Sequence, residues 1–158
     1  MRWTGGALAA STAVFCLLLL TPAGFAATLS PSESSLLRAI NATRLAHGLH
    51  ALHVDATLTR AARAHSSEML ERGAFSHGDF RARMLVSHAR GPFLGENLAW
   101  GSGSYANAQT MISEWLQSPE HRLNLLRPSF TRVGIGTSRG SFLGNDGALV
   151  VTADFAGG

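Results

Sequence analysis

Three residues of this chain have side chains that suit metal binding or acid–base chemistry. His77 ends the segment FSH, Glu96 lies in GENLAW, and His121 lies in SPEHR. Two imidazoles and one carboxylate supply the nitrogen and oxygen ligands that zinc and similar divalent cations accept. Three protein ligands would leave a fourth position for water, as in a catalytic zinc site, whereas the same groups without metal could act as a general acid and base. Their spacing is unlike HExxH, so the fold must bring them together.

Each of these residues also has a purely structural interpretation. His77 could interact with the dipole at the end of the preceding helix. Glu96 could accept backbone N–H bonds in a glycine-rich loop. His121 could be an exposed residue in the first turn of a short helix. For a fourth residue, His65, we expect a place in the core, because it lies on the apolar face of a helix.

Two helices with clear end signals precede these residues. Ser30 and Glu33 form a capping-box pattern around Pro31, and Gly48 predicts the end of that helix. Asp55 and Gly73 predict the start and end of the second helix. The expected buried face of the first helix is Leu36, Leu37, Ile40 and Leu45, and that of the second is Leu58, Ala61, Ala62, His65 and Met69.

The pattern changes from helical to extended toward the C-terminal end. Residues 78–104 read as irregular with one short helix near 80–85, followed by a helix capped by Ser104 and a short helix between Pro119 and Pro128. RVGIGTSRG and ALVVTADF are short, rich in β-branched residues and joined by GNDG, which predicts an antiparallel hairpin. Helices followed by strands predict an α+β fold in which helices cover a small sheet.

The N-terminal residues are typical of a secretory signal peptide. Arg2 precedes an apolar run of about 14 residues, shorter than the roughly 20 that a spanning helix needs, and small residues follow. We expect cleavage after Ala26, a secreted or periplasmic product, and no stable membrane anchor after cleavage. Cys16, the only cysteine, lies in this leader, so the rest of the chain is expected to have no disulfide and no thiol nucleophile.

Composition restricts the partners and the domain count. The basic residues are all Arg, and they are scattered among 10 acidic residues. Because nucleic-acid-binding domains carry a clustered basic patch, we expect no nucleic-acid partner. We divide the chain into a signal peptide (1–26), a segment leading into the first helix (27–35) and one domain (36–158), which is long enough for a single core.

Four motifs, FSH, GENLAWG, WLQSPEHRLNLL and RVGIG, resemble in order and spacing those of the CAP superfamily. This superfamily comprises the cysteine-rich secretory, antigen 5 and pathogenesis-related proteins, whose shared unit is called the SCP domain. The match is to its cysteine-free bacterial branch and covers about residues 36–155. The resemblance implies an α-β-α sandwich with a small antiparallel sheet covered by helices.

The resemblance also implies a cleft with two histidines and two acids. His77, His121 and Glu96 occupy three of these positions, and Ser118 occupies the fourth, which is a glutamate in many eukaryotic members. Glu114 and Glu120 lie nearby without matching that position.

Three functions are compatible with these residues. The first is a secreted binding module that holds a divalent cation, such as zinc, at His77, His121 and Glu96, with a small apolar or lipid ligand in a nearby groove, as known for some members of the family. The second is a metal-assisted, peptidase-like hydrolase in which Glu96 acts as the base and His77 and His121 hold metal or substrate. The third is a non-catalytic extracellular interaction domain. The sequence leaves the natural ligand and the oligomeric state open.

Overall fold

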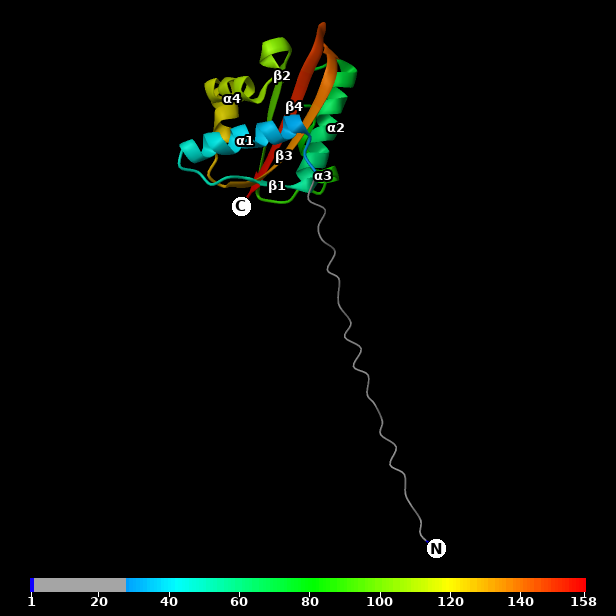
Figure 1. Cartoon of the computed structure of the whole chain (residues 1–158), viewed down its shortest axis with the longest axis vertical. Helices are drawn as coiled ribbons and strands as arrows, with labels where there is room; N and C mark the ends of the chain where they lie inside the picture. Colours follow the sequence, from blue (N-terminus) through cyan, green and yellow to red (C-terminus); the bar gives the residue numbers. More distant parts are fainter. Residues whose placement is uncertain (2–27) are drawn as a thin grey trace.

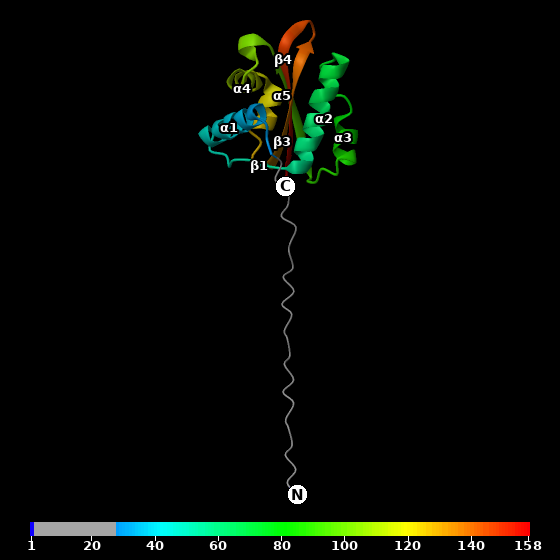
Figure 2. The same ribbon diagram turned by 45° about the vertical axis from the view of Figure 1, so that its right-hand side comes forward.

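The computed structural model describes Met1 and residues 28–158, and residues 28–158 form a three-layer α-β-α sandwich. In Figures 1 and 2, a central sheet separates one layer of α1, α4 and α5 from another of α2 and α3. The predicted fold class is therefore confirmed. The expected signal peptide lies outside the described residues except for Met1.

The helices are α1 (Pro31–Ala46), α2 (Ala56–Arg72), α3 (Phe80–Val86), η1 (Gly103–Tyr105), α4 (Ala108–Gln117) and α5 (Pro119–Leu125). The strands are β1 (His53–Val54), β2 (Phe93–Gly101), β3 (Phe130–Phe142) and β4 (Asn145–Gly157). Within residues 28–158, none of the helices has the length and apolar character to cross a membrane.

The predicted caps of the first two helices are present. The Ser30 hydroxyl accepts from the backbone N–H of Glu33 at 3.2 Å, and the Glu33 carboxylate accepts from the backbone N–H of Ser30 at 2.7 Å. Asp55 accepts backbone N–H bonds at the start of α2, and Gly73 ends α2 with a left-handed φ of 59°. Local sequence signals therefore fix both ends of α2, the helix that leads directly into the FSH segment.

The buried face of α1 differs from the prediction at one position. Leu45 is 61% exposed, so its assignment to the core was wrong. Its neighbour Arg44 is buried instead, and its guanidinium donates to the backbone carbonyls of Leu125, Arg127 and Phe130. Satisfying these carbonyls compensates for burying the charge, and it ties α1 to the chain between α5 and β3.

The four strands form one sheet in the order β1-β3-β4-β2. The predicted hairpin of β3 and β4 is confirmed, although its strands are longer than expected and its turn lies at Leu143 and Gly144, so that most of GNDG already belongs to β4. The prediction that the segment around GENLAW is irregular was wrong. Residues Phe93–Gly101 form β2, which pairs antiparallel with β4, and Glu96 therefore extends from a strand rather than from a loop.

The helix expected to be capped by Ser104 begins later than predicted. The Asn107 side chain accepts from the backbone N–H of Thr110, and α4 starts at Ala108, whereas Ser104 lies in η1. Asn and Ser cap helices in the same way, so the nearby Asn takes the role. The middle of the predicted apolar face is confirmed, because Met111, Ile112 and Trp115 are buried.

The two faces of the sheet pack against different helices. Along β4, Val151, Ala153 and Phe155 belong to the core cluster of α1 and α4, whereas the intervening residues face α2. On that second face, a Cβ atom at Gly134 would lie 2.0 Å from a backbone carbon of Leu58, and one at Gly136 would lie 2.1 Å from that of Ala62. The glycines of RVGIG thus allow α2 to pack directly on β3.

Side chains of α4 and α5 cover the outer edge of β2, the last strand of the sheet. The Trp115 indole N–H donates to the Leu98 carbonyl at 2.8 Å, and the Asn124 amide donates to the Glu96 carbonyl at 3.1 Å. These bonds satisfy backbone acceptors that an edge strand otherwise leaves unpaired. They also fix α4 and α5 to β2 at this edge, close to Glu96.

Candidate functional site

His77 and Glu96 form the centre of the candidate site. The Nδ1 atom of His77, in the loop between α2 and α3, lies 2.7 Å from Oε1 of Glu96 on β2. The His77 side chain is 55% exposed, whereas that of Glu96 is 2% exposed. In a neutral imidazole, such a carboxylate partner favours the tautomer with the proton on Nδ1, in which Nε2 keeps the lone pair that binds a metal.

Arg83, from α3, holds both members of this pair. Its Nη2 donates to Oε2 of Glu96, and its Nη1 donates to the His77 carbonyl at 3.0 Å. Each oxygen of the Glu96 carboxylate therefore has a charged or imidazole partner. The Arg83 side chain is largely buried, so these bonds are stronger than those of a surface ion pair.

His65 lies in the core, as expected, and it also contacts the site. It is 3% exposed on α2, and its Nε2 atom lies 3.0 Å from the Ser76 carbonyl. The same nitrogen lies 4.0 Å from Oε2 of Glu96. His65 therefore fixes the FSH segment against the helix that precedes it and places a second imidazole behind Glu96.

Asp154 is a second acid of the site that sequence reasoning missed. It pairs with Glu96 across β4 and β2, and it is completely buried. Neither of its carboxyl oxygens has a hydrogen-bond partner of ordinary geometry in the described structure. Burial, followed by the neighbouring Glu96 carboxylate, raises the pKa of Asp154 well above its usual range, while Arg83 acts in the opposite direction. The protonated, neutral form is thus favoured.

His121 approaches from the other helical layer. Its backbone carbonyl accepts from the Asn97 amide at 2.9 Å, which fixes the start of α5 to β2. Burial, followed by the charge of His77, lowers the pKa of the His121 ring, and Glu120 opposes this shift. This shift favours a neutral His121 ring.

The predicted site residues fall into two groups. His77 and Glu96 are bonded to each other, with Asp154 beside Glu96. His121, Ser118 and Glu114 line an adjoining hollow, whereas Glu120 does not line it. Within residues 28–158, no three His, Asp or Glu side chains converge as a ready-made set of metal ligands.

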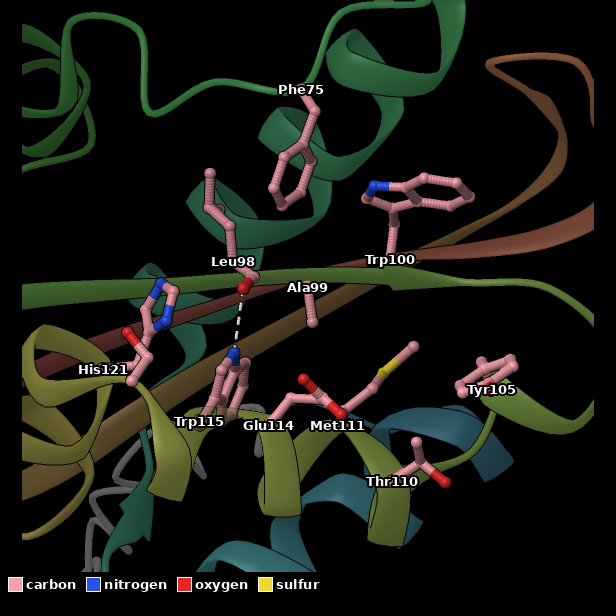
Figure 3. A pocket seen from close by; sticks show the side chains of 11 residues that line it. Phe75, Leu98, Ala99, Trp100, Tyr105, Thr110, Met111, Glu114, Trp115 and His121 are labelled. Atoms are coloured by element: carbon pink, nitrogen blue, oxygen red, sulfur yellow. Dashed lines mark hydrogen bonds between the residues drawn. The ribbon is translucent and has the colours of Figure 1, made fainter.

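The hollow beside His121 has a volume of about 330 Å³. Figure 3 shows it along β2, with Phe75 and Trp100 on one side of the strand and Met111 and Glu114 of α4 on the other. Its walls are mainly apolar, and its size lies within the range of small-molecule sites, roughly 300–1,000 Å³.

The motifs and fold are similar to those of known proteins. The family described as "Cysteine-rich secretory protein family" (CAP) matches residues 37–155. Two proteins of Bacillus subtilis are similar in sequence: the uncharacterized membrane protein YlbC, 33% identical over 113 residues (68% of this chain), and the uncharacterized protein YkwD, 31% identical over 117 residues (69% of this chain). The matched regions span 32% and 43% of these two relatives, so most of each relative has no counterpart in the match.

A solved structure has the same fold. It is that of an extracellular protein of Bacillus anthracis that contains an SCP domain. The TM-score is 0.67 at 24% identity, and the alignment covers 83% of this chain and 45% of that one.

Proposed function

This chain belongs to the cysteine-rich secretory protein (CAP) family, and on that basis we propose that it is an exported domain that binds a divalent cation such as zinc through His77 and His121. The observation that carries the proposal is the 2.7 Å contact between Nδ1 of His77 and Oε1 of Glu96. Metal-binding histidines commonly donate their second ring N–H to a carboxylate, which orients the ring and increases its basicity. The pair thus has the donor pattern of a metal site.

The two imidazoles and the carboxylate would have different roles. His77 would present Nε2 to the cation, and His121 would contribute a ring that its surroundings favour in the neutral, ligating form. Both oxygens of Glu96 already have partners in His77 and Arg83, so Glu96 would orient His77 rather than contact the metal. A bound zinc ion would supply a Lewis acid.

Binding is favoured over a metal-assisted hydrolase by the surroundings of Glu96. In the hydrolase, Glu96 would be the general base and would have to reach a substrate proton. Its side chain is 2% exposed and held by charge-assisted bonds on both oxygens. These features suit a group that positions His77 better than one that moves protons.

A small apolar ligand is a second candidate, and the hollow beside His121 favours it. Leu98, Trp100 and Met111 supply apolar surface to this hollow. Ligand sites typically combine such walls with a few polar groups, here Glu114, Ser118 and His121.

Export is supported by the leader pattern of residues 1–26 and by the description of the Bacillus anthracis protein as extracellular. The test is to express the full chain in a secreting bacterial host and to determine the N-terminus of the product in the medium. We expect it to begin at Ala27. Accumulation of the intact chain inside the cells, with none in the medium, would contradict export.

Metal binding is tested by calorimetric titration of chelator-treated, tag-free protein with zinc. We expect one ion per chain, and we expect His77→Ala and His121→Ala each to weaken binding at least about tenfold. The matched control is His53→Ala, because His53 is exposed on β1 at the opposite edge of the sheet. A double variant of His77 and His121 that bound zinc as tightly as the wild type would refute the proposal.

A further inference from the structure

We propose that the hollow beside His121 binds an organic ammonium ion, with its trimethylammonium group held against aromatic rings and balanced by the carboxylate of Glu114. This inference concerns the same hollow as the second candidate function and assigns it a cationic ligand with apolar methyl groups in place of a purely apolar one. It does not depend on metal binding at His77 and His121.

Three aromatic rings from separate elements line the hollow. Phe75 lies in the loop after α2, Trp100 on β2 and Tyr105 in η1. Phe75 and Tyr105 are 42% and 65% exposed, so both rings are accessible to a ligand in the hollow. Trp100 is packed edge-on against Phe142, with ring centroids 5.5 Å apart, so its position is fixed.

Glu114 lies where two hollows adjoin. Trp100, Tyr105 and Glu114 line both the hollow beside His121 and a neighbouring one along Gly101 and Ser102. In Figure 3, the Glu114 side chain points from α4 toward the strand that carries Trp100. The exposed carboxylate of Glu114 thus borders a hollow that is lined by aromatic and thioether side chains.

The charge of the lining selects for a cation. Among the described residues that line either hollow, Glu114 is the only Asp or Glu, and none is Arg. An anionic ligand would meet repulsion here, and a purely apolar ligand would make no use of the carboxylate.

The aromatic lining favours a quaternary ammonium over a primary one. The faces of Trp, Tyr and Phe attract cations, and a quaternary ammonium is the cation that aromatic cages commonly recognise. Its methyl groups need no hydrogen bonds, so they can contact Leu98 and Met111 without leaving a donor unpaired. A primary ammonium would bring three N–H donors to a lining with few acceptors.

The experiment compares choline with its neutral isostere, 3,3-dimethylbutan-1-ol, by NMR titration of the purified protein. We expect choline to bind at least about tenfold more tightly than the alcohol. Glu114→Gln should weaken choline binding about tenfold and leave binding of the alcohol unchanged, whereas Tyr105→Leu should weaken choline binding more than that of the alcohol. The matched control is Glu71→Gln, on the exposed face of α2, which should bind choline like the wild type.

Two results of the choline titration would contradict the proposal. Equal affinities for choline and the alcohol, or no binding of choline, would overturn the proposal. The trimethylammonium group could come from a lipid headgroup or from free choline, and a titration with monomeric dihexanoyl phosphatidylcholine separates the two. Affinity equal to that of choline would identify a lipid headgroup as a ligand. Weaker affinity would identify free choline as the ligand. Zinc titration of Glu114→Gln should match the wild type, so failure here is distinguishable from failure of the metal site.

Discussion

Asp154 lies directly opposite Glu96 in the pairing of β4 with β2, so two carboxyl groups stand side by side on the sheet face that packs against α2. The Glu96 carboxylate is bonded to His77 and Arg83, whereas the Asp154 carboxyl group is fully buried without a hydrogen-bond partner of ordinary geometry. The interior of the site therefore contains a second acid, Asp154. Position 118, which is a glutamate in many family members, is a serine in this chain.

Replacing Asp154 by Asn should change how stability depends on pH. Burial raises the folded-state pKa of Asp154, so the folded protein binds more protons than the unfolded chain above pH 4, and stability falls as pH rises. Asn keeps the shape and removes this titration. We expect Asp154→Asn to be more stable than the wild type at pH 8, by about 1 kcal/mol or more, with a smaller difference at pH 4. Urea unfolding of metal-free protein at both pH values checks this, and an equal difference at the two would count against it.

Removing Arg83 should weaken both the fold and the proposed metal site. Arg83→Leu leaves one oxygen of the buried Glu96 and the His77 carbonyl without their donor. We expect a loss of roughly 1–3 kcal/mol in unfolding free energy and a fall in zinc affinity of about 10- to 100-fold. Arg81→Leu, on the exposed side of the same helix, serves as the control for both. If Arg83→Leu bound zinc as tightly as the wild type, the bonds from Arg83 would not be needed for Glu96 to orient His77.

The ion pair between Glu33 and Arg63 should stabilise the protein above acid pH. Burial tends to raise the pKa of Glu33, but the bonds from Arg63 and the Ser30 backbone outweigh it and hold the pKa below the ordinary 4.5. This stabilisation is present at neutral pH and is lost as pH falls through the folded-state pKa.

Arg63→Gln tests this interaction. Because Glu33 is 2% exposed, the variant should lose about 1–3 kcal/mol at pH 7 and less at pH 3, while Arg60→Gln, at an exposed site of the same helix, should lose little. Thermal unfolding across this range measures both. A constant loss at all pH values would mean that Arg63 acts through packing and its bond to the Thr28 carbonyl rather than through the ion pair.

Gly136 should tolerate no side chain. A Cβ atom there would lie within 2.1–2.3 Å of Ala62 and Arg63 backbone atoms, so Gly136→Ala would force α2 away from β3. We expect a loss of at least about 3 kcal/mol. At Gly140 of the same strand, the nearest atom to a new Cβ is a Leu70 methyl at 3.1 Å, which can move, and Gly140→Ala should cost less than about 1 kcal/mol. Similar unfolding temperatures for the two variants would refute this explanation of the RVGIG motif.

The parts of the fold that could be predicted are those with local causes. The Ser30 capping box and the Asp55 cap act within a few residues, so the sequence around them is sufficient. The strand around Glu96 could not be predicted in this way. Its residues show no regular alternation, because helices cover both faces of the sheet (Figure 2). Its outer edge is covered by Trp115 and Asn124, which lie far away in the chain.

The residues of the candidate site also differ in whether the sequence alone could reveal them. His77, Glu96 and His121 could be found because their motifs resemble a family pattern. Asp154 gave one usable signal, an acid within the otherwise apolar strand VVTADF, which indicates either an edge position or a buried functional group. Arg83 gave none, since it is one of several arginines around α3 and only the packing of α3 aims it at Glu96.

The central claim is that His77 and His121 jointly hold a divalent cation while Glu96 orients His77. The most direct test is a crystal structure of the zinc-soaked protein with anomalous diffraction recorded on both sides of the zinc absorption edge. We expect one strong zinc peak contacted by Nε2 of His77 and a ring nitrogen of His121, with Nδ1 of His77 still bonded to Glu96. Full zinc occupancy elsewhere on the chain, with no peak between these two imidazoles, would contradict the account.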